Sequence, residues 1–171
     1  MVEKAPYEVV KKIDALEIRM YPALVLASVT GYDDTDAFGL LFKYISGYNT
    51  SRRKVAMTAP VITTEKIAMT APVISHTNYM AFVMPSLYDE STIPQPKDTE
   101  VSIETLPERK VAVLRFRGYT SEKEMSQRMS ELFSVLEKYK IQTKGEPFLM
   151  RYNSPFAPGI VRRNEVAVEI V

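Results

Sequence analysis

The sequence predicts an α+β fold, a pseudo-twofold distorted antiparallel β-barrel or sheet flanked by two α-helices, in a single domain over residues 1–171. Three observations support this prediction. Short runs of β-branched and aromatic residues fill most of the chain, and two segments have the three- and four-residue apolar spacing of amphipathic helices. The order strands, helix, strands also occurs twice, which indicates two related halves.

The first half begins with strands and continues with a helix. Apolar runs at 7–13, 16–22 and 23–31 predict two or three strands, because a short polar break and a proline separate them. A helix is then predicted between three aspartates and Gly47. Its apolar positions are Ala37, Leu40, Leu41, Tyr44 and Ile45. The acids lie at the positive end of this helix, and the glycine marks its end.

The second half repeats this order. Alternating strands are predicted at 101–106 and 110–118, and Ser121 with Glu124 forms a capping-box pattern that begins a second helix. One apolar stripe follows before Gly145, and it consists of Met125, Met129, Leu132, Phe133 and Leu136. Strands at 148–152 and 165–171 complete the half. Because each helix has a single apolar face, each is expected to cover a sheet.

A doubled segment lies between the halves. KVAMTAPVI at 54–62 recurs as KIAMTAPVI at 66–74 with one difference, Val55 against Ile67. Pro60 and Pro72 would break helices, so the two copies predict a hairpin joined through 63–65. A further strand is predicted at 78–85, followed by an exposed loop at 86–99.

Composition narrows the function. The 22 basic and 21 acidic residues leave a net charge of +1, which argues against a nucleic-acid partner. No stretch approaches the ~20 apolar residues of a membrane span, and the absence of cysteine fits a cytoplasmic location. We find no phosphate loop, and a nucleophile triad would have to recruit His76, the single histidine. The pattern therefore favours binding over catalysis.

Ordered segments along nearly the whole chain resemble the SOUL/haem-binding protein family. They are YEVV at 7–10, EIRMY at 17–21, KYISGYN at 43–49, the doubled AMTAPV, MAFVMPSLY at 80–88, PQP at 94–96, FRGY at 116–119, RYNSPF at 151–156 and RRNEV at 162–166. The doubled form looks most like bacterial, archaeal and plant members. The resemblance implies non-covalent binding of haem or a related tetrapyrrole in an open apolar groove beside the first helix, in the role of a carrier, buffer or sensor.

The same resemblance implies basic side chains that face the propionates of the tetrapyrrole. Lys43 matches one such position, although it is equally interpreted as a solvated lysine on the polar face of the helix. The family has a second base in the loop before RRNEV, and here this loop, 156–160, contains none. Half of the propionate clamp is therefore missing or is supplied from elsewhere.

Further cofactor-binding candidates lie on the first helix and on the predicted central strands. They are Phe38, Leu41, Phe42 and Tyr44 on the helix, with Met57 and Met69 on the strands, and all of them are also interpretable as core residues. His76 and Met20 are candidate axial ligands of haem iron. The alternatives are a surface turn residue for His76 and a core or groove filler for Met20.

Two other functions remain open. The predicted fold resembles gyrase-inhibitor-like domains that bind other amphipathic small molecules, and a buried glutamate facing the groove would favour that function. A haem-degrading or hydrolytic variant of the fold is the third hypothesis. Product formation from bound haem with a reductant, or from activated esters, would support it.

Overall fold

The computed structural model describes residues 2–52, 64–153 and 157–171. The chain divides into two compact units. Unit 1 consists of Met1–Ala5, Leu24–Ala71 and Thr77–Leu106, and unit 2 of Pro6–Ala23, Pro72–His76 and Pro107–Val171. Each unit thus combines segments that are distant in sequence. A single domain over 1–171 stays a prediction.

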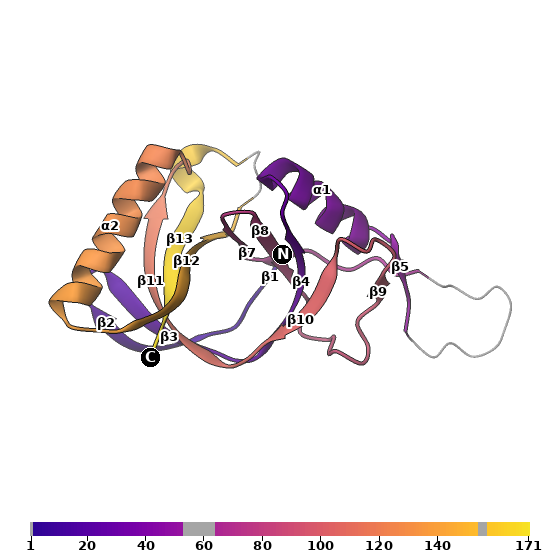
Figure 1. Ribbon diagram of the computed structural model, residues 1–171, viewed down its shortest axis with the longest axis horizontal. Coiled ribbons are helices and arrows are strands. Elements are labelled where there is room, and N and C mark those ends of the chain that lie inside the picture. Colours follow the sequence, from indigo (N-terminus) through magenta and orange to yellow (C-terminus); the bar gives the residue numbers. More distant parts are fainter. Residues whose placement is uncertain (1, 53–63, 154–156) are drawn as a thin grey trace, which may run out of the picture. The chain divides into compact units, whose positions relative to one another are not determined.

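Unit 1 places one helix on a three-stranded antiparallel sheet of order β10-β4-β8 (Figure 1). Its elements are β1 (Glu3–Lys4), β4 (Leu24–Thr30), α1 (Asp34–Ile45), β5 (Asn49–Thr50), β6 (Thr70–Ala71), β8 (Tyr79–Val83), β9 (Gln95–Pro96) and β10 (Ser102–Leu106). The short strands β1 and β6 pair in parallel, and β5 pairs with β9 in antiparallel. The inner face of α1 packs on β4 and β8.

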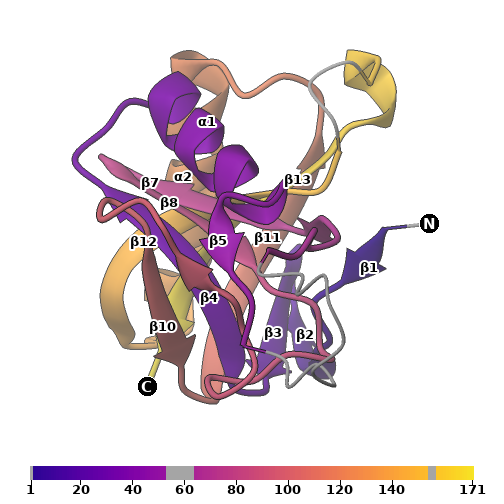
Figure 2. The same cartoon turned by 90° about the vertical axis from the view of Figure 1, so that its right-hand side faces the viewer.

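Local sequence explains where α1 begins and ends. The carboxylate of Asp33 accepts a hydrogen bond from the Asp36 backbone N–H at 2.8 Å, which caps the first turn. Ala37, Leu41, Tyr44 and Ile45 are its buried residues, as the apolar spacing predicts. Gly47 follows with a φ of 126°, a conformation that favours glycine and turns the chain into β5, which follows the C-terminal end of α1 (Figure 2).

Unit 2 contains six antiparallel strands in the order β7-β12-β13-β11-β3-β2. Its elements are β2 (Glu8–Ile13), β3 (Leu16–Tyr21), β7 (Val73–His76), β11 (Arg109–Arg117), α2 (Glu122–Lys138), β12 (Thr143–Arg151), the 3₁₀ turn η1 (Gly159–Val161) and β13 (Arg163–Ile170). Helix α2 packs on β11 and β13. Leu132 and Leu136 of α2 join Leu114, Val166 and Val168 in one buried apolar cluster.

Each unit therefore has one helix on antiparallel strands, and the predicted α+β class with its two related halves is confirmed. The strands that the sequence predicts on either side of the doubled segment are present, with three of them, β2, β3 and β4, before α1, whereas the two-residue strands β1, β5 and β9 were not predicted. In the part of the chain that the structure describes, no helix combines the length and apolarity required to cross a membrane.

The second helix ends soon after its predicted apolar stripe. It stops at Lys138, and Lys140 takes a positive φ of 55°. Gly145 lies inside β12 with a φ of 74°, where the register to β13 shifts between Lys144 and Phe148. This glycine therefore serves a bulge in the strand and not a helix end.

The doubled segment is described only in its second copy. There β6 pairs with β1, and β7 pairs with β12. The first copy, with Met57, lies outside the described residues. The hairpin between the copies stays a prediction.

Candidate functional site

Two of the candidates on α1 face the sheet of unit 1. Leu41 is fully buried and Tyr44 is nearly so. The Tyr44 hydroxyl donates to the Pro94 carbonyl oxygen at 2.6 Å, and burial raises the pKa of this phenol above its usual value. These two side chains therefore hold α1 in place and are not available to a ligand on the helix surface.

The aromatic side chains one turn apart on α1 are more accessible. The rings of Phe38 and Phe42 stack with centroids 6.0 Å apart and planes 14° from parallel. Phe38 is half-buried and meets the Phe82 ring edge-on at 5.3 Å, whereas Phe42 is 52% exposed. The stack thus runs from the core of unit 1 to its surface, and it ends in an open aromatic face.

A cation lies next to this aromatic pair in sequence. The side chain of Lys43 is 56% exposed, and its Nζ is 4.0 Å from the centre of the Tyr48 ring and 4.0 Å from a carboxylate oxygen of Asp98. Tyr48 is itself 41% exposed. We refer to Phe38, Phe42, Lys43 and Tyr48 together as the α1 surface.

Backbone links fix Tyr48 beside the end of α1. Its N–H donates to the Lys43 carbonyl oxygen at 3.1 Å. The next residue, Asn49, is fully buried, and its Nδ2 donates to the carbonyl oxygens of Tyr44 and Glu65, both at 2.8 Å. The Glu65 N–H returns a bond to the Asn49 side-chain oxygen at 3.0 Å. This arrangement explains the KYISGYN motif, because its asparagine positions the exposed tyrosine.

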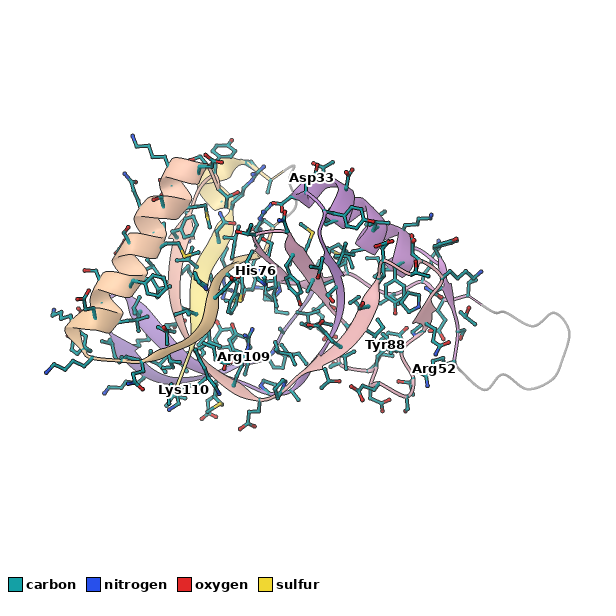
Figure 3. The ribbon with its side chains drawn as sticks, in the orientation of Figure 1. Asp33, Arg52, His76, Tyr88, Arg109 and Lys110 are labelled. Carbon is teal, nitrogen blue, oxygen red and sulfur yellow. The ribbon has the colours of Figure 1, made fainter. Side chains whose placement is uncertain are left out.

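Unit 1 also contains a cavity of about 420 Å³. It is lined by Arg52, Glu90, Ile93, Pro94, Gln95, Pro96 and Ile103. Arg52, labelled in Figure 3, donates from Nη1 to the Glu90 carbonyl oxygen at 2.8 Å. The volume falls within the range of roughly 300–1,000 Å³ that is typical of small-molecule sites.

The two candidate axial ligands belong to unit 2. Met20 is half-buried in β3, opposite Glu8 on β2 and Lys110 on β11. His76 ends β7 (Figure 3), with Nδ1 3.5 Å from a carboxylate oxygen of Glu146. Because three strands lie between β3 and β7, neighbouring strands being ~4.8 Å apart, the two side chains are not arranged to ligate one iron from opposite sides.

The methionines of the central segment are divided between core and partly accessible positions. Met80 and Met84 are buried, in agreement with the interpretation of such residues as core. Met69 is half-buried immediately before β6. Of the methionines proposed from the doubled segment, Met69 is therefore the one that a ligand could contact in the described residues.

A buried ion-pair network around Arg19 lies inside unit 2. The Arg19 guanidinium in β3 is 0% exposed and forms two bonds to the equally buried Glu165 carboxylate in β13, at 2.8 and 2.7 Å. It also donates to Glu17 at 2.6 Å and to the Tyr21 hydroxyl at 2.9 Å. The Tyr7 ring covers its outer face at 4.0 Å.

The charges in this network stabilise one another. Burial alone would raise the pKa of Glu165, but the hydrogen bonds and charge of Arg19 outweigh burial, so the pKa is lowered. Arg163 adds a further bond to this carboxylate at 2.9 Å. Burial would likewise lower the pKa of Arg19, and the bonds to Glu165 instead raise it.

The glutamate of the RRNEV motif therefore has a structural role. Asn164, the neighbouring motif residue, donates to the Gly118 carbonyl oxygen at 2.7 Å, which ties β13 to the FRGY segment. Glu165 is the only buried carboxylate among the described residues, and arginines already compensate its charge. It does not provide the free acidic group that a cation-binding, gyrase-inhibitor-like site would require.

Comparisons with known proteins agree with the motif order. The family model described as SOUL heme-binding protein matches residues 2–169. The chain is 32% identical over 170 residues to human Heme-binding protein 2, covering 95% of this chain and 82% of that protein. It is 28% identical over 180 residues to the Heme-binding protein 2 of Mus musculus, covering 97% and 87%.

Solved structures agree on the fold. An uncharacterized conserved protein from Listeria innocua superposes with a TM-score of 0.61 over 91% of this chain and 92% of that chain, at 11% sequence identity. Similarity at this identity shows the architecture alone. Together with the family match over nearly the whole length, the motifs lead to one conclusion: the chain belongs to the SOUL heme-binding protein family.

Proposed function

We propose that this protein binds haem or a related tetrapyrrole non-covalently on the α1 surface of unit 1. The observation that supports the proposal best is Phe42, an exposed aromatic side chain stacked on Phe38 and followed directly by the exposed Lys43. Phe42 and Lys43 thus offer an apolar ring face and a cation at adjacent positions of α1.

The chemistry of a porphyrin matches this arrangement. A porphyrin is a flat apolar ring system with two carboxylates at one edge. The Phe42 ring offers a face for stacking, and its partner Phe38 connects it rigidly to the core of unit 1. The Lys43 ammonium supplies a charge-assisted contact to a carboxylate. Leu41 and Tyr44, which the sequence also suggested as ligand contacts, are buried beneath α1 and hold it in place.

Binding by contact, without an axial ligand, fits the positions of Met20 and His76 in unit 2. In this proposal the iron contributes little to affinity, and iron-free protoporphyrin binds about as well as hemin. A ligand held on an open surface without a metal bond dissociates readily. These properties suit a carrier, buffer or sensor in the cytoplasm better than a catalyst.

The test is a titration with hemin followed by the Soret band and by quenching of tyrosine fluorescence. Wild-type protein should saturate near one equivalent at micromolar hemin. Phe42→Ala should weaken binding about tenfold, because a stacked aromatic contact contributes on the order of 1–1.5 kcal/mol. Phe133→Ala is the matched control, since Phe133 is an exposed phenylalanine on α2 in unit 2 and should bind as wild type.

Two results would overturn the proposal. The first is the absence of a saturable change at micromolar hemin. The second is equal loss of affinity in Phe42→Ala and Phe133→Ala, which would place the ligand elsewhere or show that the change is non-specific.

The cavity beside Arg52 supports a second candidate, the binding of a smaller amphipathic molecule. Ile103→Trp narrows this cavity without touching the α1 surface. Hemin binding unchanged in this variant supports the α1 surface, whereas loss of hemin binding would favour the cavity. If small apolar acids displace hemin from wild type but not from Ile103→Trp, the second candidate is favoured.

A further inference from the structure

We infer that Lys97 supplies the second cation of the carboxylate clamp, next to Lys43 at the Tyr48 ring. The inference rests on the proposed function and names a residue that contacts the ligand. The sequence leaves this position open, because the loop at 156–160 contains no base. The structure offers a base from a different segment, the loop that follows β9.

The pairing of β5 with β9 brings Lys97 to Tyr48. Asn49 pairs with Pro96, and Thr50 with Gln95, in antiparallel register. Continuing this register by one residue places Lys97 opposite Tyr48. The Lys97 N–H does donate to the Tyr48 carbonyl oxygen, at 3.4 Å.

The side chains follow the backbone. The Nζ of Lys97 is 5.9 Å from the centre of the Tyr48 ring, and the Nζ of Lys43 is 4.0 Å from the same centre. Two ammonium groups thus lie close to one exposed aromatic ring. A molecule with an apolar body and two carboxylates at one edge matches this pattern, because each carboxylate meets one lysine.

When no ligand is present, the Asp98 carboxylate partly compensates the positive charge of Lys43. Its carboxylate is 4.0 Å from the Lys43 Nζ, and its side chain is 24% exposed. A ligand carboxylate that approaches Lys43 must compete with this acid. Asp98 therefore weakens binding, and its removal should strengthen it.

The experiment compares protoporphyrin IX with its dimethyl ester, which keeps the ring and removes both negative charges. Lys97→Ala should weaken binding of the diacid about three- to fivefold, the range of an exposed ion pair worth up to ~1 kcal/mol. Binding of the diester should not change. Asp98→Asn should tighten diacid binding and leave the diester unaffected. Lys123→Ala on α2 is the control for loss of one exposed lysine.

The double variant Lys43→Ala/Lys97→Ala tests whether the two lysines contact different carboxylates. Two separate contacts predict that the losses add, and a single shared carboxylate predicts that the second substitution has little further effect. If wild type binds the diacid but Lys97→Ala equals Lys123→Ala, the inference is wrong and the proposed function stands. If wild type binds neither porphyrin, both are wrong.

Discussion

The two units use the same architecture but differ in where they place some of their charged and aromatic groups. Unit 1 exposes the aromatic rings of Phe42 and Tyr48 on and after its helix. Unit 2 buries an ion pair, Arg19 with Glu165, within its sheet. The two related halves therefore share a backbone arrangement but differ in the chemistry of their side chains. This difference fits the proposal that unit 1 carries the binding surface, whereas the Arg19–Glu165 pair lies in the interior of unit 2.

The outer faces of the helices show the same contrast. On α2, Arg128 forms ion pairs with Glu124 at 2.9 Å and with Glu131 at 3.6 Å, so part of the charge on its exposed face is compensated within the helix. On α1 the exposed groups include Phe42, which is 52% exposed, and Lys43, whereas the exposed phenylalanine of α2, Phe133, is 36% exposed. The comparison predicts that tetrapyrrole affinity depends on α1 and global stability depends strongly on unit 2.

The largest expected effect comes from breaking the buried ion pair. Arg19→Met leaves Glu165 buried with fewer compensating charges, and removal of one partner of a buried pair destabilises by roughly 3–5 kcal/mol. Because Arg163 still contacts the carboxylate, we expect the lower end, about 3 kcal/mol. The measurement is the free energy of unfolding in urea at neutral pH.

Lys144→Met is the matched control for this substitution. It removes an exposed cation that lies 3.7 Å from Glu169 in the same sheet, and it should change stability by less than ~1 kcal/mol. Folded Arg19→Met should retain the hemin affinity of wild type. Equal stabilities of the two variants, or a selective loss of hemin binding in Arg19→Met, would contradict the division of roles between the units.

The pH dependence of stability tests the role of the buried ion pair in unit 2. The pKa of Glu165 is lowered in the folded protein below its ordinary value of 4.5, despite burial, by the hydrogen bonds and charge of Arg19. The stabilisation by this ionised carboxylate is complete above pH 4.5 and is lost as the pH falls through the lower folded value. Wild type should therefore lose more stability than Glu165→Gln on acidification below pH 4.5. Urea unfolding at several pH values measures the difference.

Glu169→Gln provides the control for this experiment. Glu169 lies on the same strand, and its side chain is 23% exposed and paired with Arg109 at 3.8 Å. Its variant should follow the wild-type pH profile closely, because partly solvated ion pairs stabilise little. Profiles that are parallel for wild type and Glu165→Gln would show that the buried carboxylate does not control acid stability.

The elements of the fold were predictable because local signals specify them. Apolar periodicity, the aspartates before the first helix and the Ser121 capping box predicted both helices, and Tyr79–Val83 and Arg163–Ile170 follow from apolar runs. The two-residue strands were not predictable, since Gln95–Pro96 has no strand periodicity and exists only through its pairing with Asn49–Thr50. The bulge at Gly145 was not predictable, because a glycine alone does not distinguish a bulge from other turns.

The site was predictable in part. Phe42 and Lys43 followed from helix spacing and family resemblance, and both are exposed as a binding surface requires. Tyr48 and Lys97 were missed, because their proximity arises from the pairing of β5 with β9, two short strands that are distant in sequence. The burial of Arg19 was missed as well, although an arginine within the apolar run LEIRMY, together with a distant glutamate in EVAVEI, was a signal for a buried pair.

The smallest expected effect concerns the two helix caps. In α1 the Asp33 carboxylate accepts from the Asp36 N–H at 2.8 Å, and in α2 the Ser121 hydroxyl accepts from the Glu124 N–H at 3.2 Å. Asp33→Ala removes a shorter bond and a negative charge at the positive helix end, so it should destabilise by about 1 kcal/mol. Ser121→Ala should destabilise by about 0.5 kcal/mol. Urea unfolding gives both values, and Asp33→Asn, which keeps the acceptor, should recover most of the loss in α1.

Since α1 carries the proposed binding surface, Asp33→Ala should also weaken hemin binding slightly, whereas Ser121→Ala should not. The reverse order of binding effects would assign the ligand to α2 and contradict the contrast between the units.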